Sequence, residues 1–348
     1  MGESIVLEAP RTIGFEEVTD RALAANEVRL RTLYSGISAG TELTAYRGTN
    51  VYLHKQWNQA QRLFVPGDAP SKQYPVRDLG YEESGEVIEV GSSVTRVKIG
   101  DIVCGTWGHR TMHIAAEDYA AGRLLPADLD PILGIYSHMA AIALNGILDA
   151  AIRLGETVAV FGLGVPGQIV AQMAKRSGSR VIGVDMMAAR LAKAVELDAV
   201  DIPLDAGAGR IAEQIKDLTG DRGADVCIEA SGAYPALQEA VRSAGYSGKV
   251  VALGFFQGPG HSLYLGEEFH HNRINVVCSQ ISGVSPELSY RWNRDRLVRT
   301  GIRLQAEGVL QLRPLITHIV PWREAADAYR MLDQNPGAAL QVVLDFGR

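Results

Sequence analysis

Residues 162–167 read GLGVPG, after a short apolar run and ahead of residues with helical spacing. In dinucleotide-binding turns of this pattern, the first glycine permits a tight turn and the second lets the backbone approach a pyrophosphate. The third glycine permits close packing of helix and strand. The helix start adds free N–H groups and the positive end of its dipole. The predicted cofactor residues of this turn are Gly162, Gly164, Val165, Pro166 and Gly167.

An acid stands where such a turn needs one, about 20 residues downstream, at Asp185. Its carboxylate can accept hydrogen bonds from the adenosine ribose and would repel the additional phosphate of NADP, so the sequence predicts NAD. Arg190, in the following helix, would soften that preference. Ser231 and Gly232 follow a later strand, and either face the nicotinamide side or form an ordinary turn.

The elements that must position these residues alternate between strand and helix. Residues 158–161 predict a buried strand, 166–177 a helix and 181–184 the next strand. Helical spacing returns at 188–195 and 211–218, and buried strands at 226–228 and 250–253. This rhythm predicts an α/β fold with a doubly wound, parallel Rossmann sheet.

The rest of the chain has a different texture. Residues 1–128 show short strands between Gly, Pro and Asp turns, for example at 28–33, 85–90 and 101–103. A polar and aromatic segment at 46–75 predicts a long functional or mobile loop. After residue 284, helices lead to a terminal strand at 340–346. A length of 348 residues favours two domains.

Composition excludes several classes of protein. A net charge of −6 without a basic stripe argues against nucleic acid. Three dispersed cysteines form no disulfide framework and favour a reducing compartment. The N-terminus lacks a basic segment followed by an apolar run, so we expect no signal peptide. The most apolar stretch, 139–152, is predicted to be too short and polar to cross a bilayer. We expect a cytoplasmic protein that does not associate with membranes.

The order of these parts resembles the medium-chain dehydrogenase/reductases, the relatives of zinc-type alcohol dehydrogenase. The motifs that carry the resemblance are SGISAGTE at 35–42, GYEESGEVIEVG at 80–91, KIGD at 98–101, DVCIEASG at 225–232 and PLITHIVPWREAADAYRML at 314–332. The resemblance implies a β-rich, GroES-like catalytic domain at 1–130 and 285–348, and a Rossmann domain at 131–284. It also implies that the substrate lies in the cleft between them.

The family's zinc positions are altered. Ser38 stands where the family has its first cysteine ligand, with one extra residue before Thr41, and Tyr81 replaces the histidine of GHE. No cysteine lies near the domain junction, Cys104 is better explained as a small core residue, and the structural zinc loop is absent. Tetrahedral zinc prefers thiolate and imidazole. We therefore expect no metal, as in a zinc-free branch similar to bacteriochlorophyllide dehydrogenase-like proteins.

The resemblance assigns catalytic roles to what remains. Thr41 matches the hydroxyl that relays the substrate proton, and Glu42 and Glu82 match the acids of the two motifs. Ser38 is a further catalytic candidate, and Tyr81 would be an acid–base or orienting group. Its pKa of about 10 would need lowering, for instance by the nicotinamide. Alternatively, Tyr81 fills the former metal position, and both glutamates are structural hydrogen-bond anchors.

The histidines leave a further alternative open. His138 lies near the family's third-ligand region and could rebuild an oxygen and nitrogen metal site with Glu82 and Glu42, although polar packing is the more common role. His109 and His113 are more simply structural. The histidine run at 269–273 suits a loop or interface, because adjacent side chains on a strand point to opposite faces.

Together these residues predict an NAD-dependent dehydrogenase that oxidises a secondary alcohol without zinc. The polar and aromatic side chains of 46–62, with others such as Tyr290 and Trp292, suit a small polyhydroxylated substrate, for example a sugar or cyclitol. A tetrapyrrole-sized alcohol is an alternative. A zinc-free enoyl or quinone reductase would normally bind NADPH, which Asp185 opposes. A non-catalytic NAD-binding protein is the third possibility. We expect a homodimer or homotetramer.

Overall fold

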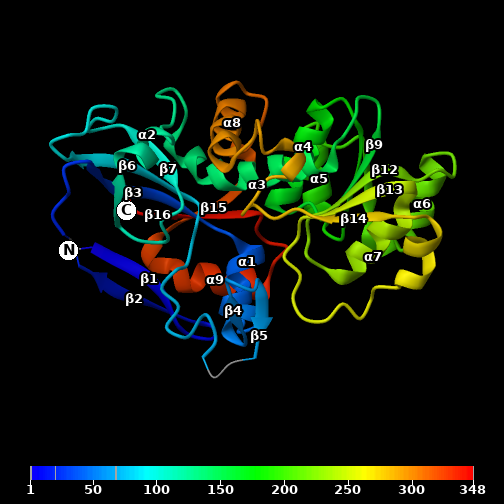
Figure 1. The fold of residues 1–348 in the computed structure, drawn as a ribbon, viewed down its shortest axis with the longest axis horizontal. Helices are drawn as coiled ribbons and strands as arrows, with labels where there is room; N and C mark the ends of the chain where they lie inside the picture. The colour runs from blue at the N-terminus through cyan, green and yellow to red at the C-terminus, as the bar shows by residue number, and fades with distance from the viewer. Residues whose placement is uncertain (1, 20, 67–68, 348) are drawn as a thin grey trace. The chain divides into compact units, whose positions relative to one another are not determined.

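The computed structural model describes residues 2–19, 21–66 and 69–347, which form two compact units (Figure 1). Unit 1 contains Met1–His138 and Ile316–Arg348, and unit 2 contains Met139–Leu315. The predicted boundaries at 130 and 284 therefore move to 138 and 315. The second boundary moves because residues 285–315 pack within unit 2. A Cβ on Gly301 would lie 2.8 Å from that of Ala140, and the Gln311 amide donates to Gln172 Oε1 over 2.8 Å.

Unit 2 is the expected doubly wound α/β unit. Its six-stranded sheet has the order β11-β10-β9-β12-β13-β14, and every neighbouring pair is parallel. The strands are β9 (Thr157–Phe161), β10 (Arg180–Asp185), β11 (Ile202–Asp205), β12 (Ala224–Glu229), β13 (Ala244–Ala252) and β14 (Asn275–Cys278). The helices are α4 (Val165–Arg176), α5 (Ala188–Glu196), α6 (Ile211–Leu218), α7 (Tyr234–Ser243) and α8 (Arg294–Ala306). The apolar run of β9 is fully buried, as a central strand requires.

Unit 1 is built on a sheet whose path is β15-β16-β3-β6-β7, with β8 paired to β3. Strand β16 comes from the end of the chain and runs antiparallel to β3 from its start, so the sheet joins distant segments (Figure 1). Its strands are β3 (Glu27–Ile37), β6 (Glu83–Val90), β7 (Ile102–Gly105), β8 (Met112–Ala116), β15 (Ile316–Pro321) and β16 (Gln341–Asp345). Outside it lie β1 (Gly2–Ala9), β2 (Thr12–Val18), α1 (Ala39–Tyr46), α2 (Glu117–Ala121) and α9 (Ala325–Gln334). Helices α1 and α9 share one apolar core, which includes Leu43 and Tyr329.

The segment predicted as a long loop at 46–75 has its own structure. It contains the 3-10 turn Val51–Leu53 and the two-stranded sheet of β4 (Gln56–Asn58) and β5 (Leu63–Val65). The Phe64 ring contacts those of Tyr52 and Trp57, with centroid distances of 5.2 and 4.9 Å. The segment is therefore held together by aromatic packing and a short sheet, instead of forming the open loop that was predicted. Residues 67–68 of the segment lie outside the described residues.

One helical segment among the described residues, Pro131–Ala150, is long and apolar enough to cross a membrane. It begins eight residues before the apolar stretch noted in the sequence, because a 3-10 turn (Pro131–Ile135) runs directly into α3 (Tyr136–Ala150). However, 72% of its apolar window is buried inside the protein. Such burial is typical of a core helix, which passes the same test of length and composition.

Two of the histidine assignments concern structure rather than chemistry. His113 stacks on Trp107 with ring centroids 5.4 Å apart and planes 7° apart. His270 and His271 lie on an exposed helical turn after Leu265–Phe269, not on a strand, with ring centroids 5.3 Å apart. The role of the 269–273 tract as a loop or interface stays a prediction.

Burial makes His113 a source of acid sensitivity. Desolvation, with Arg110 nearby, lowers its pKa from 6.5 to about 4. The contribution of the neutral His113 ring to the free energy of unfolding is fully present above the unfolded-state pKa of about 6.5. This contribution is lost as the pH falls toward about 4, because the unfolded chain then binds a proton that the folded chain does not. Between about pH 7 and about pH 5, we expect the parent to lose about 2 kcal/mol more unfolding free energy than the His113→Gln variant. Urea unfolding at both pH values measures this, and equal losses would contradict it.

Candidate active site

The glycine turn joins β9 to α4, as predicted. Gly162 has φ +87°, and a Cβ there would meet Ser231. A Cβ on Gly167 would overlap the Gly162 carbonyl oxygen, so these two glycines are needed by the fold itself. Gly164 differs, because it caps the helix at φ −64° and its Cβ would find no atom closer than 3.8 Å. The chain therefore leaves open the space in front of Gly164 and the first amides of α4, which a pyrophosphate would occupy.

Asp185 ends β10 and binds the glycine turn. Its Oδ2 accepts a hydrogen bond from the Leu163 amide over 2.7 Å, and Oδ1 accepts one from the Met187 amide over 2.8 Å. Arg190 reaches back from α5, with Nη1 3.9 Å from Asp185 Oδ2 and 3.8 Å from the Cβ position of Gly164. The structure thus brings together the predicted ribose acid, the arginine expected to soften its preference and the pyrophosphate turn.

A second strand-end turn lies beside the first, because β12 neighbours β9. Ser231 and Gly232 form it around Glu229, a buried acid that the sequence reasoning missed. The Glu229 carboxylate accepts hydrogen bonds from the amides of Ser231, at 2.8 Å, and Gly232, at 3.1 Å, and from the Ser231 hydroxyl. Burial raises the pKa of Glu229. The glutamate holds the turn, leaving the role of Ser231 and Gly232 toward the nicotinamide a prediction.

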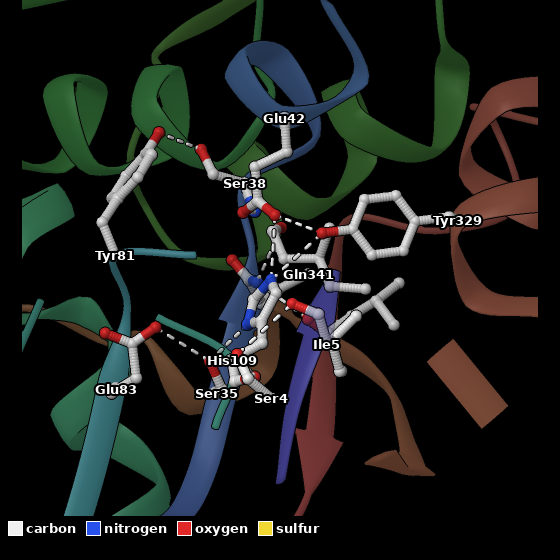
Figure 2. Close-up of polar contacts among 12 residues, drawn as sticks. Ser4, Ile5, Ser35, Ser38, Glu42, Tyr81, Glu83, His109, Tyr329 and Gln341 are labelled. Atoms are coloured by element: carbon white, nitrogen blue, oxygen red, sulfur yellow. Dashed lines mark hydrogen bonds and ion pairs between the residues drawn. The ribbon is translucent and has the colours of Figure 1, made fainter. Parts of the chain in front are cut away.

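In unit 1, the predicted proton-handling hydroxyls meet at the start of α1. Ser38 is the N-cap residue, but its side chain does not cap the helix and instead hydrogen-bonds to the Tyr81 phenol (Figure 2). Thr41, one turn along α1, also favours the ionised phenol by a side-chain hydrogen bond. The His138 ring stands edge-on to the Tyr81 ring, with centroids 5.3 Å apart. Ser38, Thr41, Tyr81 and His138 are therefore neighbours.

The protein's own groups raise the pKa of Tyr81 above its usual value of 10. Burial is the largest cause, the Glu82 carboxyl adds to it, and hydrogen bonds from Ser38 and Thr41 oppose it. The sequence-based expectation that the tyrosine pKa would be lowered finds no support in the residues around it. A phenol that keeps its proton can donate a hydrogen bond and relay a proton, but it is not itself a standing base.

Glu82 is the chemically unusual group of the site. The residue is fully buried, and neither carboxyl oxygen has a hydrogen-bond partner among the described residues. Burial raises its pKa well above 4.5, and the nearby Glu42 and Glu83 raise it further, while Ser38 and Gln341 lie close enough to oppose this. A carboxyl group with an elevated pKa suits acid–base work near neutrality.

Glu42 does not reach the hydroxyl pair as a catalytic acid. Its Oε1 accepts the Ser38 amide over 2.7 Å, and its Oε2 accepts the Tyr329 phenol and lies 2.8 Å from His109 Nε2 (Figure 2). These contacts match the alternative of a structural anchor. Its partners His109 and Tyr329 form a buried cluster with the nearby Glu83, which sequence patterns did not bring together.

Comparisons with known proteins decide the family. The alcohol dehydrogenase GroES-like domain matches residues 24–148, and the zinc-binding dehydrogenase family matches residues 166–293. D-guloside 3-dehydrogenase of Escherichia coli (strain K12) is 34% identical over 354 residues, which cover 99% of this chain and 100% of that protein. Sorbitol dehydrogenase of Halalkalibacterium halodurans is 26% identical, covering 92% and 91%. The chain belongs to the medium-chain, zinc-type alcohol dehydrogenase superfamily.

Solved structures agree on the fold. ECK1772 of Escherichia coli, an oxidoreductase/dehydrogenase of unknown specificity, superposes with a TM-score of 0.79 at 19% identity, covering 99% of both chains. Galactitol-1-phosphate dehydrogenase from Escherichia coli gives 0.78 at 20% identity, with the same coverage. The predicted fold class, a Rossmann sheet with a GroES-like domain, is confirmed. As a member of this superfamily, the protein is a dehydrogenase that acts on CH–OH groups.

The zinc ion typical of this superfamily does not fit the side chains gathered here. The candidate donors are the hydroxyls of Ser38 and Tyr81, the Glu82 carboxyl and the His138 imidazole. The two hydroxyls are hydrogen-bonded to each other, and the raised Tyr81 pKa opposes the phenolate that a metal would require. Within residues 2–19, 21–66 and 69–347, no group of three or more His, Cys, Asp or Glu could hold a metal ion. Cys104 is fully buried, in agreement with its predicted core role.

The signals for the missed residues differ in strength. Glu83 stands next to Glu82 in the motif GYEE, so a double acid at a strand start marked the region. Ser35 belongs to the same motif as Ser38 and points to Glu83. Tyr329 lies nearly 290 residues from Glu42, and no local pattern predicts that they meet.

Proposed function

We propose that this enzyme oxidises a ring secondary hydroxyl of a sugar or glycoside, with NAD as hydride acceptor and without zinc. The observation that carries the proposal is the hydrogen-bonded Ser38–Tyr81 pair beside a fully buried Glu82 that has no hydrogen-bond partner in the described part of the chain. Two hydroxyls and a carboxyl group can hold and pass on the alcohol proton at positions where relatives bind a metal.

Unit 2 supplies the binding groups for NAD. The α4 amides and the open face of Gly164 would receive the pyrophosphate, and Asp185 the adenosine ribose. When bound, NAD accepts the hydride from the carbinol carbon, which is the redox half of the reaction. Gly162, Val165, Pro166, Gly167, Ser231 and Gly232 shape the two turns, and Arg190 lies beside Asp185.

Unit 1 handles the proton. The alcohol hydroxyl would hydrogen-bond to Tyr81, with Thr41 orienting the phenol. As the C–H bond breaks, the alcohol proton passes to the Tyr81 oxygen, the Tyr81 proton to Ser38, and the Ser38 proton to ionised Glu82. The products are a ketone, reduced cofactor and protonated Glu82. Since burial makes Glu82 hold its proton, oxidation gains rate as the pH rises through the Glu82 pKa, and reduction is favoured below it.

The substrate class comes from the relatives and from the aromatic hairpin. D-guloside 3-dehydrogenase and sorbitol dehydrogenase both act on polyhydroxylated molecules by name. The β4–β5 hairpin carries Trp57 and Phe64, and the 3-10 turn before it carries Tyr52. All three are partly exposed, a combination suited to stacking against sugar rings. The likeness to bacteriochlorophyllide dehydrogenase-like proteins stays a prediction.

The direct test mixes the purified enzyme with NAD and a panel of methyl glycosides and polyols, and follows the absorbance of the reduced nicotinamide. We expect turnover of glycosides that persists after chelation, with zinc far below one ion per chain by elemental analysis. Trapping the ketone with borodeuteride would locate the oxidised ring carbon. Stoichiometric zinc whose removal stops turnover would contradict the metal-free mechanism, and an inert panel would contradict the substrate class.

The preference for NAD gives a separate prediction. Asp185→Ser removes the charge that repels a 2′-phosphate while leaving Arg190 in place, so the ratio of NAD to NADP affinity should fall by about 10–100-fold. The matched control is Asp205→Ser, because Asp205 pairs with Asp185 across neighbouring strands and caps an exposed turn. Titration of both cofactors measures the ratio. A parent that binds NADP more tightly than NAD would overturn the role of Asp185.

We also propose that the enzyme works in the cytoplasm as a homodimer or homotetramer. Strand β14 ends the unit 2 sheet and exposes 39% of Val276, and an open apolar edge of this kind favours pairing with another strand. Light scattering of the purified protein tests the assembly, and a monomer at micromolar concentration would contradict it.

A further inference from the structure

The hydrogen bonds around Glu83 determine whether the Nδ1 nitrogen of His109 carries a proton. The Glu83 carboxylate accepts the Ser35 hydroxyl at Oε1, over 3.0 Å, and the Trp107 amide at Oε2, over 2.7 Å. Because the one hydroxyl proton of Ser35 is donated to Glu83, Ser35 has no proton to donate to His109. The 2.7 Å contact between the Ser35 oxygen and His109 Nδ1 therefore needs a proton on Nδ1 (Figure 2).

The same reasoning applies to the other nitrogen. Glu42 accepts the Ser38 amide at Oε1 and the Tyr329 phenol at Oε2, so the phenol proton is also used. His109 Nε2 lies 2.8 Å from Glu42 Oε2 and 3.1 Å from the Tyr329 oxygen. A proton on Nε2 satisfies this contact, and both nitrogens of His109 then carry protons. The neighbouring carboxylates, Glu42 first, raise the pKa of His109 against the effect of burial.

The positive charge of His109 should affect how tightly Glu82 holds its proton. Three carboxyl groups, those of Glu42, Glu82 and Glu83, lie in one buried region with a single imidazolium. The Glu42 and Glu83 carboxyl groups accept the Tyr329 phenol and the Trp107 amide, whereas neither oxygen of Glu82 has a hydrogen-bond partner in the described part of the chain. Burial raises the pKa of Glu82 well above 4.5. Polar groups from five elements face His109. They are Ser35 on β3, Glu42 on α1, Glu83 on β6, Tyr329 on α9 and the Ser4 hydroxyl on β1. The next residue in the chain, Arg110, is also charged. The polar groups facing Glu82 are Tyr81, Glu83, Ser38, Glu42 and Gln341.

We propose that His109 is a buried, permanently charged positioning residue. Through Glu42 it holds the Ser38 peptide in place, and its positive charge determines the pH at which Glu82 gives up its proton. Since His109 touches neither oxygen of Glu82, it acts through the two carboxylates that flank it. The kinetic part of this proposal rests on the proposed function, whereas the charge of His109 and its effect on Glu82 can be measured in the enzyme without substrate.

Infrared titration tests the proposal without turnover. The carbonyl band of protonated Glu82 is identified as the band that Glu82→Gln removes, and its midpoint is followed against pH in the parent and in His109→Gln. Loss of the imidazolium leaves Glu42 and Glu83 uncompensated, so the midpoint should rise by roughly one pH unit. The matched control is His113→Gln, four residues away, because His113 is neutral near pH 7 and its removal changes no charge. Its midpoint should not move.

Two further measurements keep the proposal open to refutation if His109→Gln folds poorly. In the parent, nitrogen NMR of labelled histidines should show His109 as imidazolium well above about pH 6.5, the ordinary histidine value. On an active substrate, the limb of kcat/KM that rises with pH should move upward in His109→Gln by the same amount as the infrared midpoint. A neutral His109, or an unmoved Glu82 midpoint in a folded variant, would overturn the proposal. An inactive parent with the expected spectra would instead count against the proposed function alone.

Discussion

Gly164→Val is expected to abolish NAD binding, lowering affinity at least about 100-fold, while the protein stays folded. The valine side chain would stand in the space where the α4 amides face a pyrophosphate. The fold should tolerate the valine, because Gly164 has an ordinary backbone φ of −64°. The atoms nearest to a Cβ at this position, from Arg190 and Pro166, lie 3.8 and 3.9 Å away. The expected stability cost is about 1 kcal/mol for a poorer helix cap. Calorimetric titration with NAD and thermal unfolding without it measure the two quantities.

Two controls separate ligand space from chain strain. Gly266→Val places the same side chain where no atom lies within 4 Å, and should change neither NAD affinity nor stability. Gly167→Ala would place a Cβ against the Gly162 carbonyl oxygen, so it should lower the melting temperature even without NAD. If Gly164→Val binds NAD as the parent does, the turn is not the pyrophosphate site.

Tyr81→Phe should lower kcat for alcohol oxidation by about 10²–10⁴, the usual range for losing a group that transfers a proton. The phenol is the member of the hydroxyl pair that would touch the substrate, and Ser38 alone would be left to reach Glu82. NAD affinity should change little, because Tyr81 belongs to unit 1 and the dinucleotide turns to unit 2. Steady-state kinetics over a range of pH, with a separate NAD titration, measure both effects.

The comparison variant for this experiment is Tyr119→Phe. It removes a phenol oxygen that accepts the Thr106 amide over 2.9 Å, elsewhere in unit 1, and should leave kcat within about twofold. A Tyr81→Phe enzyme as active as the parent would make the tyrosine a filler of the former metal position, which is the alternative that the sequence left open.

Local patterns predicted the arrangement of the glycine turn and its acid well, while their binding of a dinucleotide stays a prediction. The turn at 162–167, its acid Asp185 and the strands that flank them depend on residues close in sequence, whose spacing reflects helix and strand geometry. Asp185 does end β10, and Arg190 does lie beside it. The sequence could not show that Asp185 also accepts the Leu163 amide, because that contact depends on how β9 and β10 are aligned.

The proposed proton-handling site was predicted only in part, for a physical reason. Motif matching located Ser38, Thr41, Tyr81 and Glu82, but the environment that sets their proton affinities comes from distant segments. Tyr329 and Gln341 arrive with the last forty residues, and His109 from the turn before β8. Residues 285–315 were assigned to the wrong unit because helical spacing alone does not say against which sheet a helix packs.

The place of β16 between β15 and β3 has a consequence for synthesis in the cell. Ser38, Tyr81, Glu82 and His109 are all made early, yet the sheet behind them stays open and Glu42 lacks the Tyr329 phenol until residues 316–345 have left the ribosome. At about 5–20 residues per second, that delay after residue 138 lasts roughly 10–40 s. During this interval the Tyr34–Ile37 part of β3 exposes an unpaired edge to neighbouring nascent chains. A messenger RNA that ends before codon 316 would thus yield a chain with the Rossmann segment but without β15, β16 and the Tyr329 phenol.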